Sequence, residues 1–100
     1  MITTRAVLDE LRSIEDPELG ISIVELGLVY RVGIDGDAIE VDFTLTYPGC
    51  PAEPIIRGAI LEKLQRAFGT RKVKAAVVWK PPWGPERMSE EARLDLGYPV

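Results

Sequence analysis

The sequence predicts an α+β fold in two layers, in which helices pack on a small mixed sheet in the order helix, strand, strand, helix, strand, helix. Apolar residues at helical spacing mark the helices, and apolar–polar alternation marks the strands. The dipeptide Asp35-Gly36 between the first two strands is a strong hairpin signal, so these strands run antiparallel. A helix then separates the second strand from the third, which makes the sheet mixed and places the helices on one face.

The first predicted helix begins at Thr3 or Thr4, because either side chain can cap it. It ends at Asp16-Pro17, since the residue before a proline is pushed out of the helical region. Charged residues fall on one side of the helix, which indicates one exposed and one buried face. The residues of the buried face are Val7, Leu8, Leu11 and Ile14.

The turn after this helix places two carboxylates, Asp16 and Glu18, two residues apart. Asp and Pro are common in turns, and an Asp side chain often accepts hydrogen bonds from nearby backbone. Taken alone, the pair is more typical of turn structure than of acid–base chemistry. The following residues, 21–26, form either a short strand or an extended segment packed on the core, and Gly27 ends that segment.

The hairpin strands are predicted at Leu28–Ile34 and Ile39–Leu45. Thr44 and Thr46 share one face of the second strand with Asp42, and threonine is a favoured strand residue. Strand propensity alone therefore explains both threonines. Their interest is that this face leads directly into the only cysteine of the chain.

That cysteine, Cys50, follows the pattern-breaking turn Tyr47-Pro48-Gly49 and precedes a helix. Free backbone N–H groups and the helix dipole favour an anion at such a position. They can lower a cysteine pKa to about 3.5–7.5, so we expect a thiolate. The alternative is a small buried apolar residue, which is the common role of a lone cysteine.

Two prolines complicate the start of this helix. Pro51 suits the first helical position, but Pro54 would then stand where a backbone N–H is first needed. A helix that becomes regular only at Pro54 removes the conflict and puts Cys50 above the terminus. Gly69 is the predicted C-terminal cap, and one face carries the apolar residues Ile56, Ile60, Leu64 and Phe68.

The third strand is predicted at Val73–Trp79, with Trp79 on the same face as Val73. The next six residues, 80–85, hold three prolines and a glycine and are predicted to be irregular. Within them, Trp83 either covers the core or anchors a partner protein. Ser89 is the predicted cap of the last helix.

The amino-acid composition argues against several classes of function. The 100 residues, 46% of them apolar, indicate a single globular domain over 1–100. A net charge of −4 with scattered basic residues argues against nucleic acid as a partner. No stretch has the apolar character of a membrane span or a signal peptide, so with one cysteine we expect a cytoplasmic location. The absence of histidine excludes a Cys–His pair and an imidazole zinc site within one chain.

Five segments, in their order and spacing, resemble the small iron–sulfur cluster assembly family that includes SufT, eukaryotic cytosolic targeting-complex proteins and PaaD of the phenylacetate pathway. They are Asp16-Pro17-Glu18, residues 24–29, Thr44-Leu45-Thr46 with Cys50-Pro51, Pro81-Pro82-Trp83, and residues 88–93. The sequence stops at Val100 without the cysteine-bearing tail of PaaD-type members, which favours the SufT-like branch.

The resemblance implies an accessory or adaptor factor in the maturation of iron–sulfur proteins, with no established enzymatic turnover and with Cys50 as the functional thiol. Its implied partners are iron–sulfur assembly proteins and client apoproteins. By position, it also implies a set of site-lining residues: Asp16, Glu18, Thr44, Thr46, Trp83, Met88 and Ser89.

One thiol without imidazole cannot supply the four ligands of an iron–sulfur cluster, so no cofactor is expected to bind stably in a monomer. A transient iron or cluster at Cys50, or one shared between the two chains of a homodimer, stays open. Two alternatives to the adaptor also remain. One is a small enzyme with Cys50 as nucleophile and Asp16 or Glu18 as acid–base, and the other is an interaction module that uses Pro82-Trp83.

Overall fold

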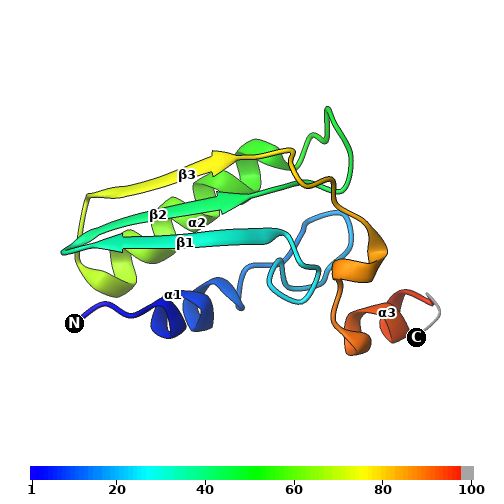
Figure 1. Cartoon of the computed structure of the whole chain (residues 1–100), viewed down its shortest axis with the longest axis horizontal. Helices are drawn as coiled ribbons and strands as arrows, with labels where there is room; N and C mark the ends of the chain where they lie inside the picture. The colour runs from blue at the N-terminus through cyan, green and yellow to red at the C-terminus, as the bar shows by residue number, and fades with distance from the viewer. Residues whose placement is uncertain (98–100) are drawn as a thin grey trace.

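The computed structural model describes residues 1–97, which form three helices, one 3₁₀ turn and three strands in the predicted order (Figure 1). The preference for the SufT-like branch over the PaaD type depends on the C-terminal end of the sequence. The last three residues, 98–100, lie outside the described residues. The elements are α1 (Thr4–Leu11), β1 (Val29–Asp35), β2 (Ala38–Phe43), α2 (Glu53–Phe68), β3 (Val73–Val77), η1 (Pro85–Arg87) and α3 (Glu90–Leu96). The predicted α+β fold class is confirmed.

The sheet is mixed, as predicted, with the strand order β1-β2-β3. β1 and β2 are antiparallel with Ile34 opposite Ile39. Their two-residue turn is Gly36-Asp37, one residue later than the predicted Asp35-Gly36, because Asp35 still pairs with Ala38. β2 and β3 are parallel with Val41 opposite Ala75, because α2 carries the chain back to the starting edge. This register points the alternate residues of β2 toward the helices.

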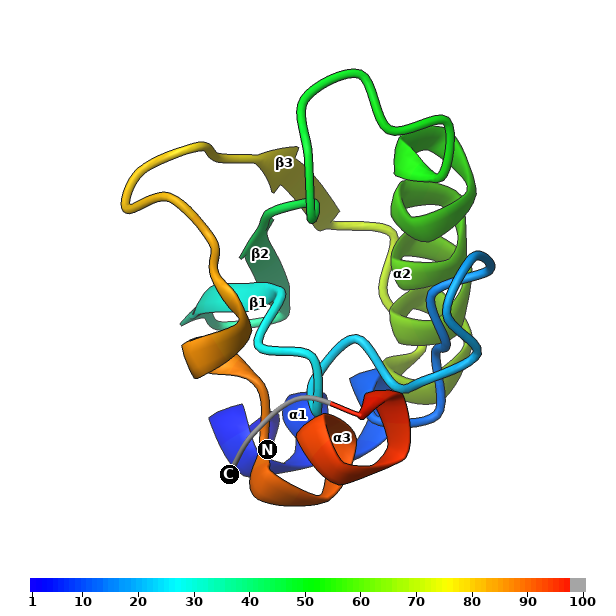
Figure 2. The same cartoon turned by 90° about the vertical axis from the view of Figure 1, so that its right-hand side faces the viewer.

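Two helices form the second layer. α1 packs against β1, α2 packs against β3, and the two helices touch each other on the same face of the sheet (Figure 2). The core between the layers includes the fully buried residues Leu11, Ile39, Val41, Phe43, Ile60 and Leu64. α3 lies beyond the end of the sheet at which β2 terminates, so it closes one end rather than covering the face (Figure 1). No helix within residues 1–97 is long and apolar enough to span a membrane.

Helix α1 is shorter than predicted. Thr3 caps it, since its hydroxyl accepts a hydrogen bond from the Ala6 amide at 3.1 Å, but the helix ends at Leu11 instead of Asp16. The Ile14 amide turns back to the Leu11 carbonyl at 3.0 Å, which tightens the chain into a turn. Proline therefore marks the acidic turn and not the end of the helix.

Residues 23–27 form consecutive turns after a bend at Ile21 and an isolated bridge at Ser22, so the expectation of a strand or extended segment over residues 21–26 is wrong. The Leu26 amide donates to the Ser22 carbonyl at 3.0 Å, and a single bridge pairs Ser22 with Glu15. Ile23 and Leu26, three residues apart, are both fully buried. That spacing fits a helical turn, which brings both side chains to one side, whereas a strand would separate them.

Strand β3 is also shorter than predicted, because it ends at Val77. Its neighbour β2 ends at Phe43, which pairs with Val77, and beyond them only the Val78 amide still reaches the Phe43 carbonyl. Trp79 therefore leaves the sheet and is 45% exposed, instead of lying on the core face with Val73.

Candidate functional site

Cys50 lies just before α2, at the end of the loop that leaves β2. The helix begins at Glu53 with Ala52 in the capping position and Pro54 in its first turn, so the thiol stands above the helix terminus. This agrees with the irregular start that the two prolines predicted. The loop brings Cys50 back onto the core, where only 5% of its surface is exposed.

The acidic turn is built around Asp16, which is 1% exposed. Its Oδ1 accepts hydrogen bonds from the backbone amides of Glu18 at 2.8 Å and Leu19 at 3.2 Å. Asp16 therefore does what turn chemistry predicted, and it shapes the backbone. The consequence is that the next carboxylate, Glu18, projects from a fixed turn.

Glu18 reaches across to Cys50, although 32 positions separate them in the chain. The Cys50 Sγ donates to Glu18 Oε1 at 3.1 Å, and the Tyr47 hydroxyl donates to the same carboxylate at 3.2–3.3 Å. We call Glu18, Tyr47 and Cys50 the thiol cluster. The thiol proton is thus directed at an exposed carboxylate that can accept it.

The thiolate expected from the helix terminus is not what the surroundings favour. Burial and then the hydrogen bond to the Glu18 carboxylate raise the pKa of Cys50, because both oppose a negative sulfur. The Ala52 amide and the Tyr47 hydroxyl lower the pKa of Cys50 without reversing that direction. Desolvation, followed by the bonds to Cys50 and Glu18, raises the pKa of Tyr47 to about 12. The cluster therefore keeps both of its protons at neutral pH.

Two grooves adjoin the thiol cluster, and both are lined by Thr46, Tyr47 and Trp83. The first, of about 350 Å³, is completed by Leu45, Pro48, Trp79 and Pro82. The second, of about 440 Å³, is completed by Leu19, Met88 and Leu96. We call them the Trp83 grooves. The Trp83 indole N–H donates to the Leu26 carbonyl at 2.8 Å, which holds the shared wall in place.

The remaining predicted site residues lie in supporting positions. Thr44 is 1% exposed, and its amide donates to the Leu28 carbonyl at 2.8 Å, so it fixes the end of the hairpin. Ser89 caps α3, as predicted, by accepting from the Ala92 amide at 3.1 Å. The structure therefore brings Glu18, Cys50, Thr46, Trp83 and Met88 to one region and leaves Asp16, Thr44 and Ser89 in roles that shape it.

Sequence reasoning missed Tyr47 as a site residue. Its hydroxyl bonds Glu18, and its ring lines both Trp83 grooves. The available signal was its place three residues before the lone cysteine, across a Pro-Gly turn that folds the two side chains toward the same carboxylate.

The profile of a protein family described as "Iron-sulfur cluster assembly protein" matches residues 4–77. The chain belongs to this iron–sulfur cluster assembly family. It is 43% identical over 83 residues to the Fe-S protein maturation auxiliary factor SufT of Staphylococcus aureus, covering 82% of this chain and 94% of that one. It is 39% identical over 92 residues to the Fe-S protein maturation auxiliary factor YitW of Bacillus subtilis, covering 91% and 90%.

A solved structure has a similar fold. The crystal structure of a domain of unknown function from Bacillus anthracis matches this fold with a TM-score of 0.88 and 37% identity, over 93% of this chain and 90% of that one. The family resemblance predicted from the five segments is confirmed.

The donor atoms of the thiol cluster do not fit a resident iron–sulfur cluster of this family within one chain. Glu18 and Cys50 offer one carboxylate and one thiol, whereas such clusters are held by four ligands that are mostly thiolates. Within residues 1–97, no group of three or more Asp, Glu, Cys or His side chains is arranged to hold a metal ion. The donors of a single chain are therefore too few for a resident cluster.

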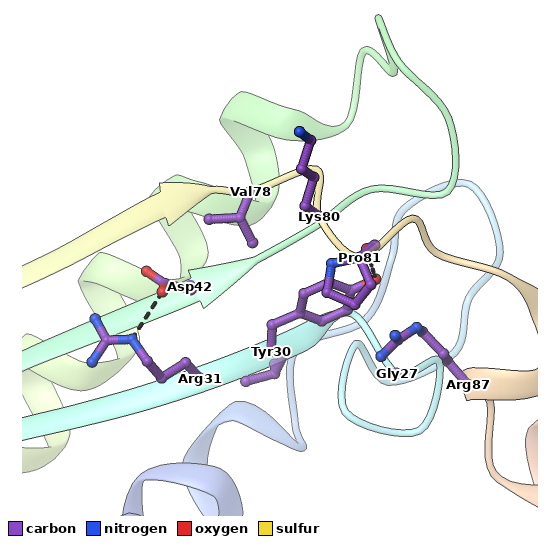
Figure 3. A pocket seen from close by; sticks show the side chains of 9 residues that line it. Gly27, Tyr30, Arg31, Asp42, Val78, Lys80, Pro81 and Arg87 are labelled. Carbon is purple, nitrogen blue, oxygen red and sulfur yellow. Dashed lines mark hydrogen bonds and ion pairs between the residues drawn. The ribbon is translucent and has the colours of Figure 1, made fainter.

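A separate cavity of about 520 Å³ opens near Tyr30 and Arg87 (Figure 3). It shares no lining residue with the Trp83 grooves or the thiol cluster. It therefore has to be explained independently of the thiol.

Proposed function

We propose that this protein is an accessory factor in the maturation of iron–sulfur proteins, and that it acts as an adaptor through Cys50. The observation that carries the proposal is the 3.1 Å contact between the Cys50 thiol and Glu18, in a buried position beside two grooves. Its partners are iron–sulfur assembly proteins and client apoproteins. The membership of the family, and relatives named as maturation auxiliary factors, support the same role.

The thiol cluster supplies a simple exchange chemistry. When the Cys50 sulfur binds iron that a partner delivers, its proton moves to the Glu18 carboxylate, so the sulfur becomes the thiolate that metals require. The Tyr47 hydroxyl then remains as a hydrogen-bond donor to the sulfur or the carboxylic acid. Release reverses the steps, because Glu18 returns the proton when the iron leaves. A single thiolate binds iron weakly, which suits the transfer of iron better than its storage.

A complementation experiment tests this role. In cells that lack the protein, Cys50→Ser should fold normally yet fail to restore the activity of iron–sulfur enzymes. Cys50→Ala, which suits the apolar surroundings, should fail in the same way and so separate the thiol from its packing. Asp9→Asn, on the exposed side of α1, is the matched control and should restore activity fully. Normal rescue by Cys50→Ser would rule out the thiol.

A small cysteine enzyme is the second candidate, because Glu18 stands within hydrogen-bond reach of the thiol as an acid–base must. Asp16 does not share this role, since its Oδ1 is occupied by two backbone amides. Varying the abundance of this protein in the complementation experiment separates the two candidates. An enzyme should restore full activity of the iron–sulfur enzymes at a small fraction of its normal abundance, whereas the activity restored by an adaptor should rise in proportion to its abundance. We propose the adaptor, and we place it in the reducing cytoplasm, where a lone thiol persists.

The interaction-module reading concerns the Trp83 grooves. Trp83→Ala removes the shared wall and one hydrogen bond, so it should reduce capture of the partner whichever reading holds. Cys50→Ser distinguishes them. It should leave partner capture intact in a pure interaction module, while in the proposed adaptor it should abolish transfer but not the initial contact.

A further inference from the structure

The cavity near Tyr30, which we call the basic pocket, opens on the face of the sheet away from α1 and α2. Its floor and walls combine an aromatic ring, aliphatic groups and charges around an opening of about 520 Å³. Its lining residues are Gly27, Val29, Tyr30, Arg31, Asp42, Val78, Lys80, Pro81 and Arg87. Neither the fold nor the thiol chemistry requires this concentration of cationic residues.

The aromatic floor is held in position. The Tyr30 hydroxyl donates to the Pro81 carbonyl at 2.9 Å, which ties β1 to the loop after β3. The Arg87 guanidinium lies 4.7 Å from the centre of the Tyr30 ring, over its face, and Figure 3 shows both side chains at the same end of the pocket. Such a cation–ring contact orients the arginine while leaving its N–H donors available.

The backbone at this end is held equally closely. A Cβ on Gly27 would clash with the Arg87 carbonyl oxygen, so only glycine lets the two segments approach this closely. The Met88 amide also turns back to the Pro85 carbonyl at 3.1 Å and closes η1. Arg87 thus projects from a fixed turn.

The charges of the basic pocket are only partly balanced. Arg31 is already bound to Asp42 at 2.9 Å and to Glu40 at 3.1 Å. Lys80 and Arg87 are exposed, and within residues 1–97 no carboxylate lies within ion-pair distance of either. On a chain with a net charge of −4, this leaves two available cations beside an apolar floor.

We propose that the basic pocket binds an acidic segment of a partner protein, in which an apolar side chain is flanked by carboxylates. The apolar side chain would pack on Tyr30 and Val78, and the flanking carboxylates would pair with Lys80 and Arg87. A free phosphate fits less well, because such ions are usually held by converging backbone N–H groups. Here the cations stand apart around a hydrophobic centre, which is the arrangement of a protein interface.

This inference goes beyond the adaptor role and does not depend on it. Along the loop after β3, Val78, Lys80 and Pro81 face the basic pocket, whereas Trp79, Pro82 and Trp83 line a Trp83 groove. A partner in the basic pocket therefore leaves the thiol cluster uncovered. Peptide binding can be measured without iron, so its failure and a failure of Cys50 complementation are separate results.

The probe is a labelled hexapeptide that alternates glutamate and leucine, with the same peptide carrying glutamine for glutamate as its uncharged counterpart. Titration into the ¹⁵N-labelled protein should shift amide signals of residues 27–31, 78–80 and 87 and leave Cys50 unmoved. Lys80→Glu should weaken binding by about tenfold or more, and Arg87→Gln should weaken it by several-fold. Raising the salt from about 50 mM to about 500 mM should weaken it further.

Lys74→Glu is the matched control, because Lys74 is an exposed lysine on β3 outside the pocket and the substitution makes the same charge change. It should leave the affinity within about twofold, since such charges are screened over about 8 Å at physiological salt. Three results would overturn the proposal: an equal loss of affinity with Lys74→Glu, equal binding of the uncharged peptide, or amide shifts at the Trp83 grooves. So would equivalent shifts with inorganic phosphate, or a peptide-independent dimer in a mass measurement.

Discussion

At the residue scale, Glu18 has two opposed effects on Cys50. Its negative charge disfavours a thiolate and raises the pKa of the thiol, yet its oxygen is the acceptor that can remove the thiol proton. Tyr47 opposes the first effect, because its hydroxyl donates to the Glu18 carboxylate and lowers the pKa of Cys50. The pKa of Cys50 is therefore raised by burial first and by Glu18 second, and the Ala52 amide and the Tyr47 hydroxyl oppose that rise.

Glu18→Gln tests this balance. Removing the charge should lower the pKa of Cys50 and accelerate its alkylation by iodoacetamide at mildly alkaline pH. Each pKa unit lost gives about a tenfold gain in thiolate fraction. The pH dependence of the alkylation rate measures the change, and an unchanged profile would contradict the role of Glu18.

Tyr47→Phe should move the pKa of Cys50 in the opposite direction, because the hydroxyl that lowers it is lost. Alkylation at a given pH should become slower, and the whole rate profile should shift toward higher pH. A shift in the same direction as Glu18→Gln would mean that both substitutions act merely by opening the site.

Alkaline pH should destabilise the fold through the same two groups. Their ordinary pKa values are 9.0 for the thiol and 10.0 for the phenol, and both pKa values are raised in the folded state, that of Tyr47 to about 12. The folded protein therefore holds these protons more tightly than the unfolded chain does. Their stabilisation is complete below about pH 9 and declines as the pH rises toward 12.

The measurement is the urea midpoint at a series of pH values. A Tyr47→Phe/Cys50→Ala double variant should show a flatter profile than the natural protein across the window above pH 9, because it lacks both groups. If the two profiles stay parallel, the raised pKa values do not contribute to stability.

Cys50 could be chosen from sequence, because the chain offers no other thiol and no histidine. Its charge state could not. Local sequence gives the helix terminus, but the carboxylate that opposes a thiolate comes from a turn 32 positions away. Tyr47 escaped notice for the same reason, since its importance lies in a contact made only after folding.

At the element scale, the hairpin, α2 and α3 followed from local signals: alternation, an Asp-Gly pair, a glycine cap and a serine cap. The structure of the segment from Arg12 to Leu28 could not be predicted from such local signals. Its turns are fixed by tertiary contacts, including the full burial of Ile23 and Leu26, and local patterns cannot distinguish these from a short strand. This segment also delivers Glu18, so the least predictable part of the fold contributes to the candidate site.

Gly27 ties that segment to η1, and its substitution should be costly. Gly27→Ala forces a Cβ against the Arg87 carbonyl at a backbone φ of 74°, so we expect a loss of about 3–4 kcal/mol in the free energy of unfolding. Gly20→Ala is the control, because its φ of 68° is similar but nothing lies within 4 Å of the added atom. It should cost about 1–2 kcal/mol. Denaturant unfolding measures both, and equal losses would show that crowding at Arg87 is unimportant.

At the scale of the whole molecule, the features fall into two regions. The thiol cluster and the Trp83 grooves gather between the end of β2, the start of α2 and the acidic turn. The basic pocket lies on the face of the sheet that no helix covers, and the loop after β3 separates it from the Trp83 grooves (Figure 3). Each region has its own lining residues, which suits a protein whose proposed task is to bring two others together.

Anaerobic reconstitution with iron and sulfide tests the molecule as a carrier. With one thiol per chain, the monomer should lose any iron–sulfur absorbance on desalting, and retained absorbance should appear only with a dimer in a native mass measurement. Cys50→Ser should abolish the retained signal. A stable cluster in a monomer would contradict the conclusion drawn from the donor set.

The hydrogen between Cys50 and Glu18 has a consequence for how cargo is taken up. A metal can occupy that sulfur only when the hydrogen passes to Glu18, so loading leaves Glu18 protonated and unloading returns the hydrogen to the sulfur. Acidic conditions therefore act as a competitor of iron, and mild alkalinity assists it until the fold itself begins to weaken. Uptake should accordingly be greatest in a band of pH bounded below by competition and above by unfolding.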